Sequence, residues 1–448
     1  MDRNPWQGGI LTGQRRVEEN MLKKGFFAAA ETIAYLIFFF LTIRRIVGDG
    51  LLSFEEQAFD KTIHEMVLWF LLILVFSYFA YKQSVIQQYF LLWKRNWILL
   101  PFLFFALCSI AWSTNVVATI YKGIVLLGCT TIAAYTGLAH RDSFIFRELK
   151  WFLFCLAIAT FIFALADPLA GTHVGYPYYG AWRGIFWSKN YMGPMMAFGN
   201  LVAVFNIVES RKKLLLFLGN ILFYVLTAFL VFLSKCATAT ILFVVLNLGF
   251  LLVVAWVKLK NRLKKIHYFT LGLVCIVILV LGSLNLNFLF GLLNRNASLT
   301  GRLPFWSFLL DNGLKNAPII GNGLGATWES NNFRFTSMSD IKWDLPPLVS
   351  DNGYMDIFLH LGLIGVSLLI IVVLFCLFRA VRHAIKFQSI GSFFPILSMI
   401  IIIIVNFSLS FFLELESFAW FLMVFGLFTS TPFPKKLKAM EEIQKSPA

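Results

Sequence analysis

Long apolar stretches separated by short polar segments dominate this chain, and they predict a bundle of membrane-spanning helices. A helix needs about 17 to 25 mostly apolar residues to cross a hydrocarbon core of roughly 30 Å. The predicted spans are residues 26–43, 66–81, 97–112, 116–138, 151–167, 191–208, 214–233, 237–257, 268–290, 353–378, 393–411 and 417–430. The last two windows also fit one re-entrant hairpin. We therefore predict an all-α, polytopic membrane protein with about twelve transmembrane helices, forming one domain over residues 1–448.

The longest interruption of this pattern is a large loop at residues 291–352, between the ninth and tenth predicted spans. It contains the motifs SLTGRLPFW and PIIGNGLG, and it ends in SDNGYMDIFLHLGLIG, which continues into the next apolar helix. A membrane-embedded chain has no solubility reason to keep a segment of this length with Gly, Arg and Asp residues. We therefore expect the loop to meet a substrate.

The distribution of Lys and Arg predicts the orientation of the bundle. With the N-terminus in the cytoplasm, the segments on that side contain 26 of the 38 basic residues, those on the other side contain 11, and Lys122 lies within the fourth span. Because cytoplasmic loops are enriched in Lys and Arg, both termini are predicted to be cytoplasmic and residues 291–352 periplasmic. The net charge of +15 then reflects topology and contact with anionic lipid headgroups, and nucleic-acid binding is not expected.

Composition supports a membrane protein and argues against a metal centre. The chain is 59% hydrophobic and 14% charged, whereas soluble domains contain about 25% charged residues. The six Cys are scattered through apolar runs without CxxC spacing, so they predict neither a disulfide framework nor a zinc site. No His, Asp or Glu cluster has metal-ligand spacing, and we expect neither a metal nor a cofactor.

Two short loops contribute cations on the face where cations are scarce. Arg183, Lys189 and Asn190 lie in GAWRGIFWSKNYMG, and Lys235 lies in the turn LSKCAT. A guanidinium can bind phosphate oxygens through two hydrogen bonds. An ordered aromatic loop at headgroup level explains the first sequence equally well, and a turn lysine more often extends to the interface. His173 is a candidate acid or base, although a single loop histidine is more often incidental.

The large loop supplies the remaining candidates at its two ends. Arg302 lies in the first turn of a predicted amphipathic surface helix, where backbone N–H groups and the helix dipole favour an anion. Asp351 directly precedes a span, so it can be a general base of raised pKa or the N-cap of that helix. Asn352, Tyr354 and Glu414 are further candidates for substrate contacts.

Taken together, the motifs WRGIFWSKNYMG, SLTGRLPFW, PIIGNGLG and DNGYMD…GLIG resemble the O-antigen ligase and O-antigen polymerase (Wzy-type) superfamily of bacterial envelope glycosyltransferases. The resemblance covers the whole architecture and implies a GT-C-like fold. The ligase pattern is His, then Asn, Ser or Gln, then nine residues and GxxG. Here Asn352, Gly362 and Gly365 match it, whereas Asp351 stands at the position of the ligase His. Ligases are thought to activate the sugar acceptor with that His, so the departure favours a polymerase.

The resemblance also implies the reaction and its participants. Arg183 and Arg302 would bind the diphosphate of an undecaprenyl-diphosphate-linked glycan, with Lys189 and Lys235 as weaker additions. We expect an inverting glycosyltransferase of the bacterial inner membrane that polymerises O-antigen or exopolysaccharide repeat units at the periplasmic face, with Asp351, Arg302 and Arg183 as catalytic residues. The acceptor would be a glycan or a lipid-linked glycan, and a chain-length regulator is a further expected partner.

Two alternatives stay open at this point. The first is an O-antigen ligase that transfers the lipid-linked glycan to lipid A-core or another acceptor, with Asp351 in place of the His. The second is a transporter of lipid-linked glycans. Few charged residues, Glu31 and Lys122 among them, lie within predicted spans, and no inverted repeat is apparent, which argues against a transporter.

Overall fold

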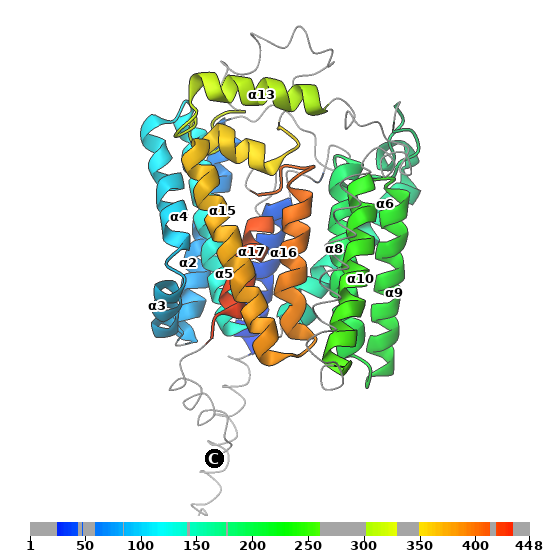
Figure 1. Ribbon diagram of the computed structural model, residues 1–448. Coiled ribbons are helices and arrows are strands. Elements are labelled where there is room, and N and C mark those ends of the chain that lie inside the picture. Colours follow the sequence, from blue (N-terminus) through cyan, green and yellow to red (C-terminus); the bar gives the residue numbers. More distant parts are fainter. Residues whose placement is uncertain are drawn as a thin grey trace, which may run out of the picture.

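Helices account for all regular secondary structure in the described part of the chain. The computed structural model describes residues 25–43, 47, 59–83, 85–140, 144–175, 178–259, 302–328, 349–412 and 418–432. Eight helices in these ranges are long and apolar enough to cross a membrane. They are Gly25–Ile43, Thr62–Lys82 within α2 (Phe59–Lys82), α5 (Val116–Ala139), Arg147–Ala166, which includes α6 (Lys150–Ala166), α8 (Lys189–Glu209), α9 (Leu214–Leu233), α10 (Ala237–Leu259) and α15 (Gly353–Phe387). Figure 1 shows them side by side in one bundle.

The remaining predicted spans have other forms. Helix α3 (Ile86–Arg95) meets α4 (Leu99–Cys108) at a bend of 90°, so the window 97–112 corresponds to α4 and its short extension. Helices α16 (Phe394–Val405) and α17 (Phe418–Ser430) are apolar but shorter than a full span. The window 268–290 lies outside the described residues. An all-α, multi-pass membrane protein is confirmed, whereas the total of twelve spans stays a prediction.

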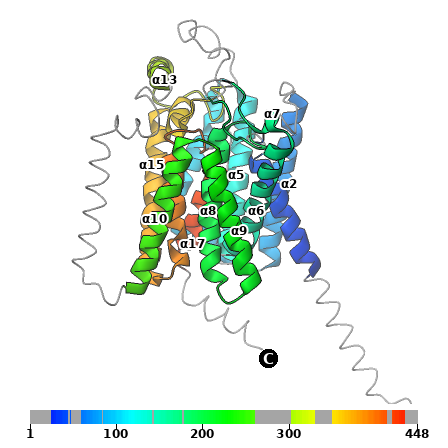
Figure 2. The ribbon, with the colours of Figure 1, turned by 90° about the vertical axis from the view of Figure 1, so that its right-hand side faces the viewer.

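Burial separates the central helices from those that face lipid. The most apolar window of α8 is 83% buried and every residue of α17 is buried, whereas the corresponding window of α10 is only 22% buried. Helix α17 packs against α5, α15 and α16, and its Trp420 Nε1 donates to Thr130 Oγ1 of α5 at 2.9 Å. Figure 2 shows α8 between α10 and α6. The exposed Leu, Ile and Phe side chains of the outer helices are therefore lipid contacts.

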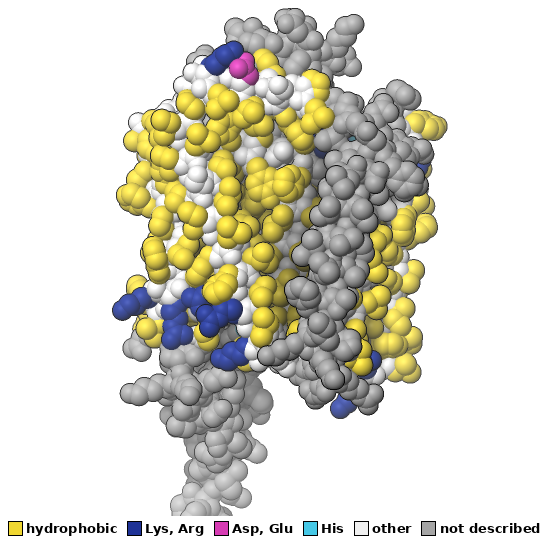
Figure 3. All heavy atoms as spheres, in the orientation of Figure 1, with side chains coloured by type: hydrophobic (Ala, Val, Ile, Leu, Met, Phe, Trp, Pro, Cys, Tyr) yellow, Lys and Arg dark blue, Asp and Glu magenta, His cyan; other side chains and the backbone are white. Residues whose placement is uncertain are grey.

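One end of the bundle is covered by α13 (Arg302–Asn316), which lies across the helix axes (Figures 1 and 2). Its Phe305, Leu309 and Gly313 are buried, and Gly313 lies so close to Phe358 of α15 that an added Cβ would come within 2.5 Å of the ring. The surface helix predicted to begin near Arg302 is thereby confirmed. We call this end of the bundle the α13 end. Basic side chains gather at the opposite end, where α3 and α15 finish (Figure 3).

A break in α15 is stabilised by the glycine-rich loop 318–323. Gly362 has φ 63° and ψ −165°, so the helix is interrupted there. The carbonyls of Leu359 and His360 accept hydrogen bonds from the N–H groups of Asn322 (3.1 Å) and Gly323 (2.9 Å). On the other side of the break, Leu363 N donates to Pro318 O at 2.9 Å. The loop thus supplies the partners that a broken helix loses.

We expect Gly362→Ala to destabilise the protein. This combination of φ and ψ is populated almost only by glycine and costs any other residue about 1–3 kcal/mol. In addition, a Cβ at this position would lie 2.3 Å from the carbonyl carbon and oxygen of Ile319. Thermal unfolding of the purified variant in detergent should therefore begin several degrees below that of the wild type. Gly219→Ala is the matched control, because nothing lies within 4 Å of its added Cβ; equal loss in both variants would contradict this account.

Candidate active site

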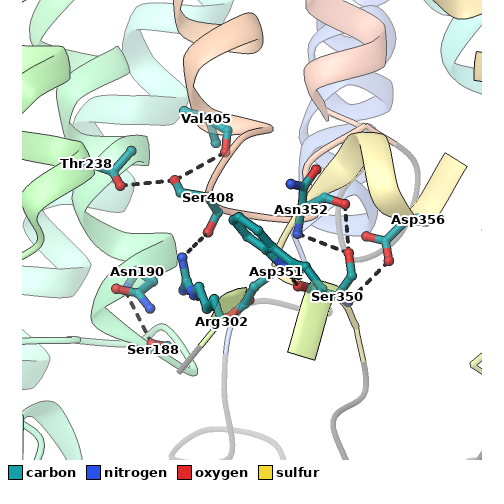
Figure 4. Close-up of polar contacts among 11 residues, drawn as sticks. Ser188, Asn190, Thr238, Arg302, Ser350, Asp351, Asn352, Asp356, Val405 and Ser408 are labelled. Atoms are coloured by element: carbon teal, nitrogen blue, oxygen red, sulfur yellow. Dashed lines mark hydrogen bonds and ion pairs between the residues drawn. The ribbon is translucent and has the colours of Figure 1, made fainter. Parts of the chain in front are cut away.

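The two ends of the large loop meet in a direct contact between Arg302 and Asp351. Arg302 Nη2 lies 2.9 Å from Asp351 Oδ2, and Nη1 donates to the backbone carbonyl of Ser408 at 2.8 Å. Figure 4 shows the guanidinium between these two partners, which come from the start of α15 and from the segment joining α16 to α17. The side chains of Arg302 and Asp351 remain 17% and 31% exposed. A ligand can therefore reach both, and at least two guanidinium N–H groups are free of these contacts.

Asp351 has a backbone and an electrostatic environment unlike those of a surface carboxylate. Its φ is +53°, in the left-handed region that Asp tolerates better than most residues. Burial raises the pKa of the Asp351 carboxyl above its usual range, while the charge and hydrogen bond of Arg302 oppose that rise. A partly desolvated carboxylate beside an arginine can accept a proton, and it also orients the guanidinium.

The residue after Asp351 caps α15, which corrects one of the two roles considered for Asp351. The side-chain oxygen of Asn352 accepts hydrogen bonds from Tyr354 N (3.0 Å) and Met355 N (3.2 Å). Asp351 is therefore not the N-cap. The predicted contact of Asn352 with substrate is untested, but its side-chain oxygen already bonds the helix end. The cap also fixes where the neighbouring Asp351 carboxylate points.

Three further contacts hold the loop around Asp351 in place. Trp306 Nε1 on α13 donates to Ser350 O at 2.8 Å, and Ser350 N donates to Asp356 Oδ1 at 3.2 Å. Trp328 Nε1 donates to the same Asp356 oxygen at 3.0 Å. Asp356 is 2% exposed, so its carboxylate supports the loop from beneath and does not face solvent.

Arg183 in the aromatic loop and Lys189 at the start of α8 both donate to backbone carbonyls. Arg183 Nε donates to Ala170 O at 2.7 Å, and its Nη1 donates to Trp187 O at 3.1 Å. Lys189 Nζ donates to Lys235 O at 3.2 Å and lies 4.3 Å from the centre of the Tyr178 ring. Both side chains therefore organise the loop as well as contributing charge.

Lys235 and Asn190 lie beside this loop with fewer contacts. Lys235 is exposed, and its Nζ lies 3.4 Å from Tyr179 O, a long contact. Asn190 is half-buried in the first turn of α8, and its backbone N–H is bonded to the Ser188 hydroxyl at 3.3 Å (Figure 4). For both residues, contact with a substrate stays a prediction.

Lys189 affects the pKa of two groups: it shares His173 with Arg183 and Cys236 with Arg302. Burial, Arg183 and Lys189 together lower the pKa of His173 to about 4, so His173 is neutral at pH 7 and its Nε2 accepts a hydrogen bond from Lys189 N. Burial raises the pKa of the Cys236 thiol, and the charges of Lys189 and Arg302 oppose that rise. Lys189 and Arg302 thus both contribute positive potential at Cys236, whereas Arg183 and Lys189 do so at His173. The candidate role of His173 as a proton donor does not fit its low pKa.

Two of these cations occupy the first position of a helix. Lys189 is the first residue of α8 and Arg302 is the first residue of α13, and neither helix has an acidic residue in its first turn. The helix dipole disfavours a cation there and favours an anion. The carboxylate of Asp351 supplies negative charge at the N-terminus of α13. Additional negative charge between the N-termini of α8 and α13 would also be stabilised.

An apolar pocket in the bundle adjoins the segment that holds Arg302. Ten side chains of α8, α16, α17 and the segment between the last two line it: Pro194, Met195, Phe198, Ile401, Ile402, Val405, Phe411, Phe418, Ala419 and Leu422. Val405 ends α16, and Phe411 lies in the same connecting segment as Ser408. A charged group bound at Arg302 would therefore have apolar surface nearby.

The last two predicted site residues are Tyr354 and Glu414. The Tyr354 hydroxyl donates to Ile403 O at 3.2 Å and its ring packs 4.8 Å from Phe407, so it connects α15 with α16. Glu414 lies outside the described residues. Within the described ranges no group of three or more His, Cys, Asp or Glu could hold a metal ion.

Ser408 and Thr238 are site residues that the sequence did not single out. Ser408 O binds Arg302, and its hydroxyl accepts a hydrogen bond from Thr238 Oγ1 at 3.0 Å (Figure 4). The only sequence signal is the polar pair Asn406 and Ser408 between two apolar helices. That signal marks a turn and does not identify a partner for an arginine.

The comparison with known families gives a match over part of the chain. Residues 222–370 match the family described as O-antigen ligase. The matched segment contains Lys235, Arg302 and Asp351, whereas Arg183 and Lys189 precede it. The predicted resemblance to the O-antigen ligase and polymerase superfamily is confirmed over this segment. No curated protein matches the chain.

Proposed function

On the premise of the match between residues 222–370 and the family described as O-antigen ligase, we propose that this chain is a polymerase of lipid-linked glycans. It takes an oligosaccharide on undecaprenyl diphosphate as donor and a second lipid-linked repeat unit as acceptor. The contact of 2.9 Å between Arg302 and Asp351 carries the proposal, because it puts a cation for the leaving group beside a carboxylate for the acceptor.

The proposed reaction is one displacement. A hydroxyl of the acceptor attacks the anomeric carbon of the donor, the bond from that carbon to the diphosphate oxygen breaks, and undecaprenyl diphosphate leaves with the electron pair. Asp351 takes the hydroxyl proton. Arg302 stabilises the negative charge that develops on the leaving diphosphate, aided by Arg183 and Lys189. Direct displacement inverts the configuration at the anomeric carbon.

The environment of the site supports a donor with a charged head and an apolar tail. Positive potential from Lys189 and Arg302 converges near Cys236, and a diphosphate would occupy that field. The neighbouring pocket is lined by apolar side chains alone, so apolar surface lies beside the position proposed for the charged head. Preorganised cations at the leaving group are an effective catalytic device, because they need no rearrangement during the reaction.

The charge distribution supports a periplasmic position for the site. The basic residues that end α3 and α15 lie at the opposite end of the bundle. Because cytoplasmic ends of membrane proteins are enriched in Lys and Arg, the α13 end is assigned to the periplasm in this proposal. Lipid-linked repeat units would then be joined on the outer side of the inner membrane.

A ligase is the second candidate, because the matched family is described as O-antigen ligase. In that reaction Asp351 would activate a hydroxyl of lipid A-core or another acceptor in place of the ligase His. The donor and the leaving group would be the same, so the geometry of the site fits both reactions.

The glycan profile of a deletion strain separates the candidates. Loss of a polymerase leaves single repeat units on the acceptor, whereas loss of a ligase leaves polymerised glycan on the lipid carrier. We expect single repeat units, restored to a ladder by the wild-type gene. Polymer that accumulates on the carrier would replace the polymerase with the ligase, and an unchanged ladder would contradict both.

A further inference from the structure

A second cluster of cations lies at the end of the bundle opposite α13. Lys94 and Arg95 end α3, and Arg379, Arg382 and Lys386 lie in the last turns of α15. Arg379 Nη2 donates to Arg95 O at 3.0 Å, so the two helix ends are in direct contact. Figure 3 shows dark-blue side chains gathered in this region. None of the five forms any of the ion pairs found among the described residues.

Arg379 is the centre of the cluster and is incompletely satisfied. Its side chain is half-buried, and its Nε is buried without a hydrogen-bond partner in the described part of the chain. The guanidinium lies over the Phe375 ring at 5.0 Å, which restricts its movement. The charges of Arg382 and Arg95 both act on it. Three guanidinium groups at this range repel one another, and a bound anion would offset that repulsion.

The surroundings identify the depth of the cluster in the membrane. Helix α3 turns by 90° from α4, and its Phe90 is 71% exposed. On α15, Leu374 and Phe378 are 60% and 54% exposed on the side that faces lipid. The cluster therefore lies where apolar side chains give way to polar ones, which is the level of lipid headgroups. A ligand here would have its anionic part on the arginines and its apolar part along α15.

We propose that Arg95, Arg379 and Arg382 bind the phosphate headgroup of an anionic phospholipid, whose acyl chains lie along Leu374 and Phe378. Basic niches between transmembrane helices are suited to such headgroups. All three cations are arginines, and the planar guanidinium can form paired hydrogen bonds with phosphate oxygens. The site lies at the far end of the bundle from Arg302, so it does not depend on the proposed polymerase activity.

The test is native mass spectrometry of the full-length protein with phosphatidylglycerol or phosphatidylethanolamine added to the detergent. We expect the wild type to retain phosphatidylglycerol preferentially, and Arg379→Gln/Arg382→Gln to lose at least tenfold of that retention. Lys212→Gln/Lys213→Gln is the matched control, because it removes two exposed charges from the turn between α8 and α9 at the same end. We expect that variant to bind like the wild type.

Three outcomes would overturn the proposal. They are equal loss in the two double variants, equal retention of both lipids by the wild type, and binding of added inorganic phosphate without preference between the lipids. If Arg379→Gln/Arg382→Gln does not fold, Arg382→Gln alone serves. Arg382 is exposed and its side chain lies over the Phe378 ring at 5.5 Å, so its loss should leave the bundle intact. Retention should still fall severalfold.

Discussion

Replacing Arg302 by Ala should reduce glycan transfer by about 10² to 10³-fold, which is typical for loss of one preorganised electrostatic contact to the reacting groups. The reason is that the variant loses the cation for the leaving diphosphate and also the partner that orients Asp351. Transfer is measured with purified protein and an undecaprenyl-diphosphate-linked oligosaccharide, by the lengthening of the glycan. Arg302→Lys should retain part of the rate, because it keeps the charge but cannot contact Ser408 O and Asp351 in the same planar geometry.

Lys315→Ala is the matched control for Arg302→Ala. Lys315 is on the same helix α13 and pairs with Asp311 at 2.6 Å, and both side chains are largely exposed. Its removal should leave the rate within about twofold, because exposed pairs contribute little. Normal glycan ladders from Arg302→Ala, with folded protein in the membrane, would remove the proposed role of Arg302.

Arg183→Ala is expected to abolish lengthening as well, and its role in catalysis stays a prediction.

Replacing Asp351 by Asn should lower the transfer rate by about 10² to 10⁴-fold, the range for loss of a general base. Asn is similar in size and keeps one acceptor oxygen, but it cannot take a proton. Asp311→Asn removes another carboxylate at the α13 end and should leave the rate nearly unchanged. If Asp351→Asn retained most of the activity while still folding, Asp351 would be a residue that positions Arg302 and not a base.

The pH dependence of the rate gives an independent measure of the same role. Burial raises the pKa of the Asp351 carboxyl above 3.8, and the carboxylate is the active form. The rate should therefore fall as the pH drops through this raised pKa, at a higher pH than for an ordinary Asp. The fall should be absent from the residual activity of Asp351→Asn. A wild-type rate that stays constant down to pH 4 would contradict a base of raised pKa.

Much of the bundle could be predicted because the length of an apolar run alone decides whether a helix can span the bilayer. The windows 116–138, 191–208 and 214–233 coincide with α5, α8 and α9 to within two residues. The break at Gly362 could not be predicted in this way. It depends on backbone hydrogen bonds between residues 318–323 and 359–364, and a backbone group leaves no trace in the residue types.

In the candidate site too, the sequence predicts individual residues but not the contacts between them. The first turn of a predicted surface helix singled out Arg302, and the membrane edge singled out Asp351, but their contact joins residues 49 positions apart. Nothing in either motif fixes that pairing. Ser408 contributes its carbonyl, which every residue possesses, so its side chain gave no signal. Conversely, Asn352 matched a family motif and proved to cap α15, because the same amide that can bind a substrate can also satisfy a helix end.

The partners of Arg302 also determine when the site can form during synthesis. Asp351 follows Arg302 by 49 residues and Ser408 follows it by 106. The ribosome therefore makes all of α15 and α16 before the last partner of the guanidinium exists. A nascent chain that stops before Ser408 has its first arginine contact but not its second. Assembly of this centre is a late event of translation, and incomplete chains are inserted without a finished site.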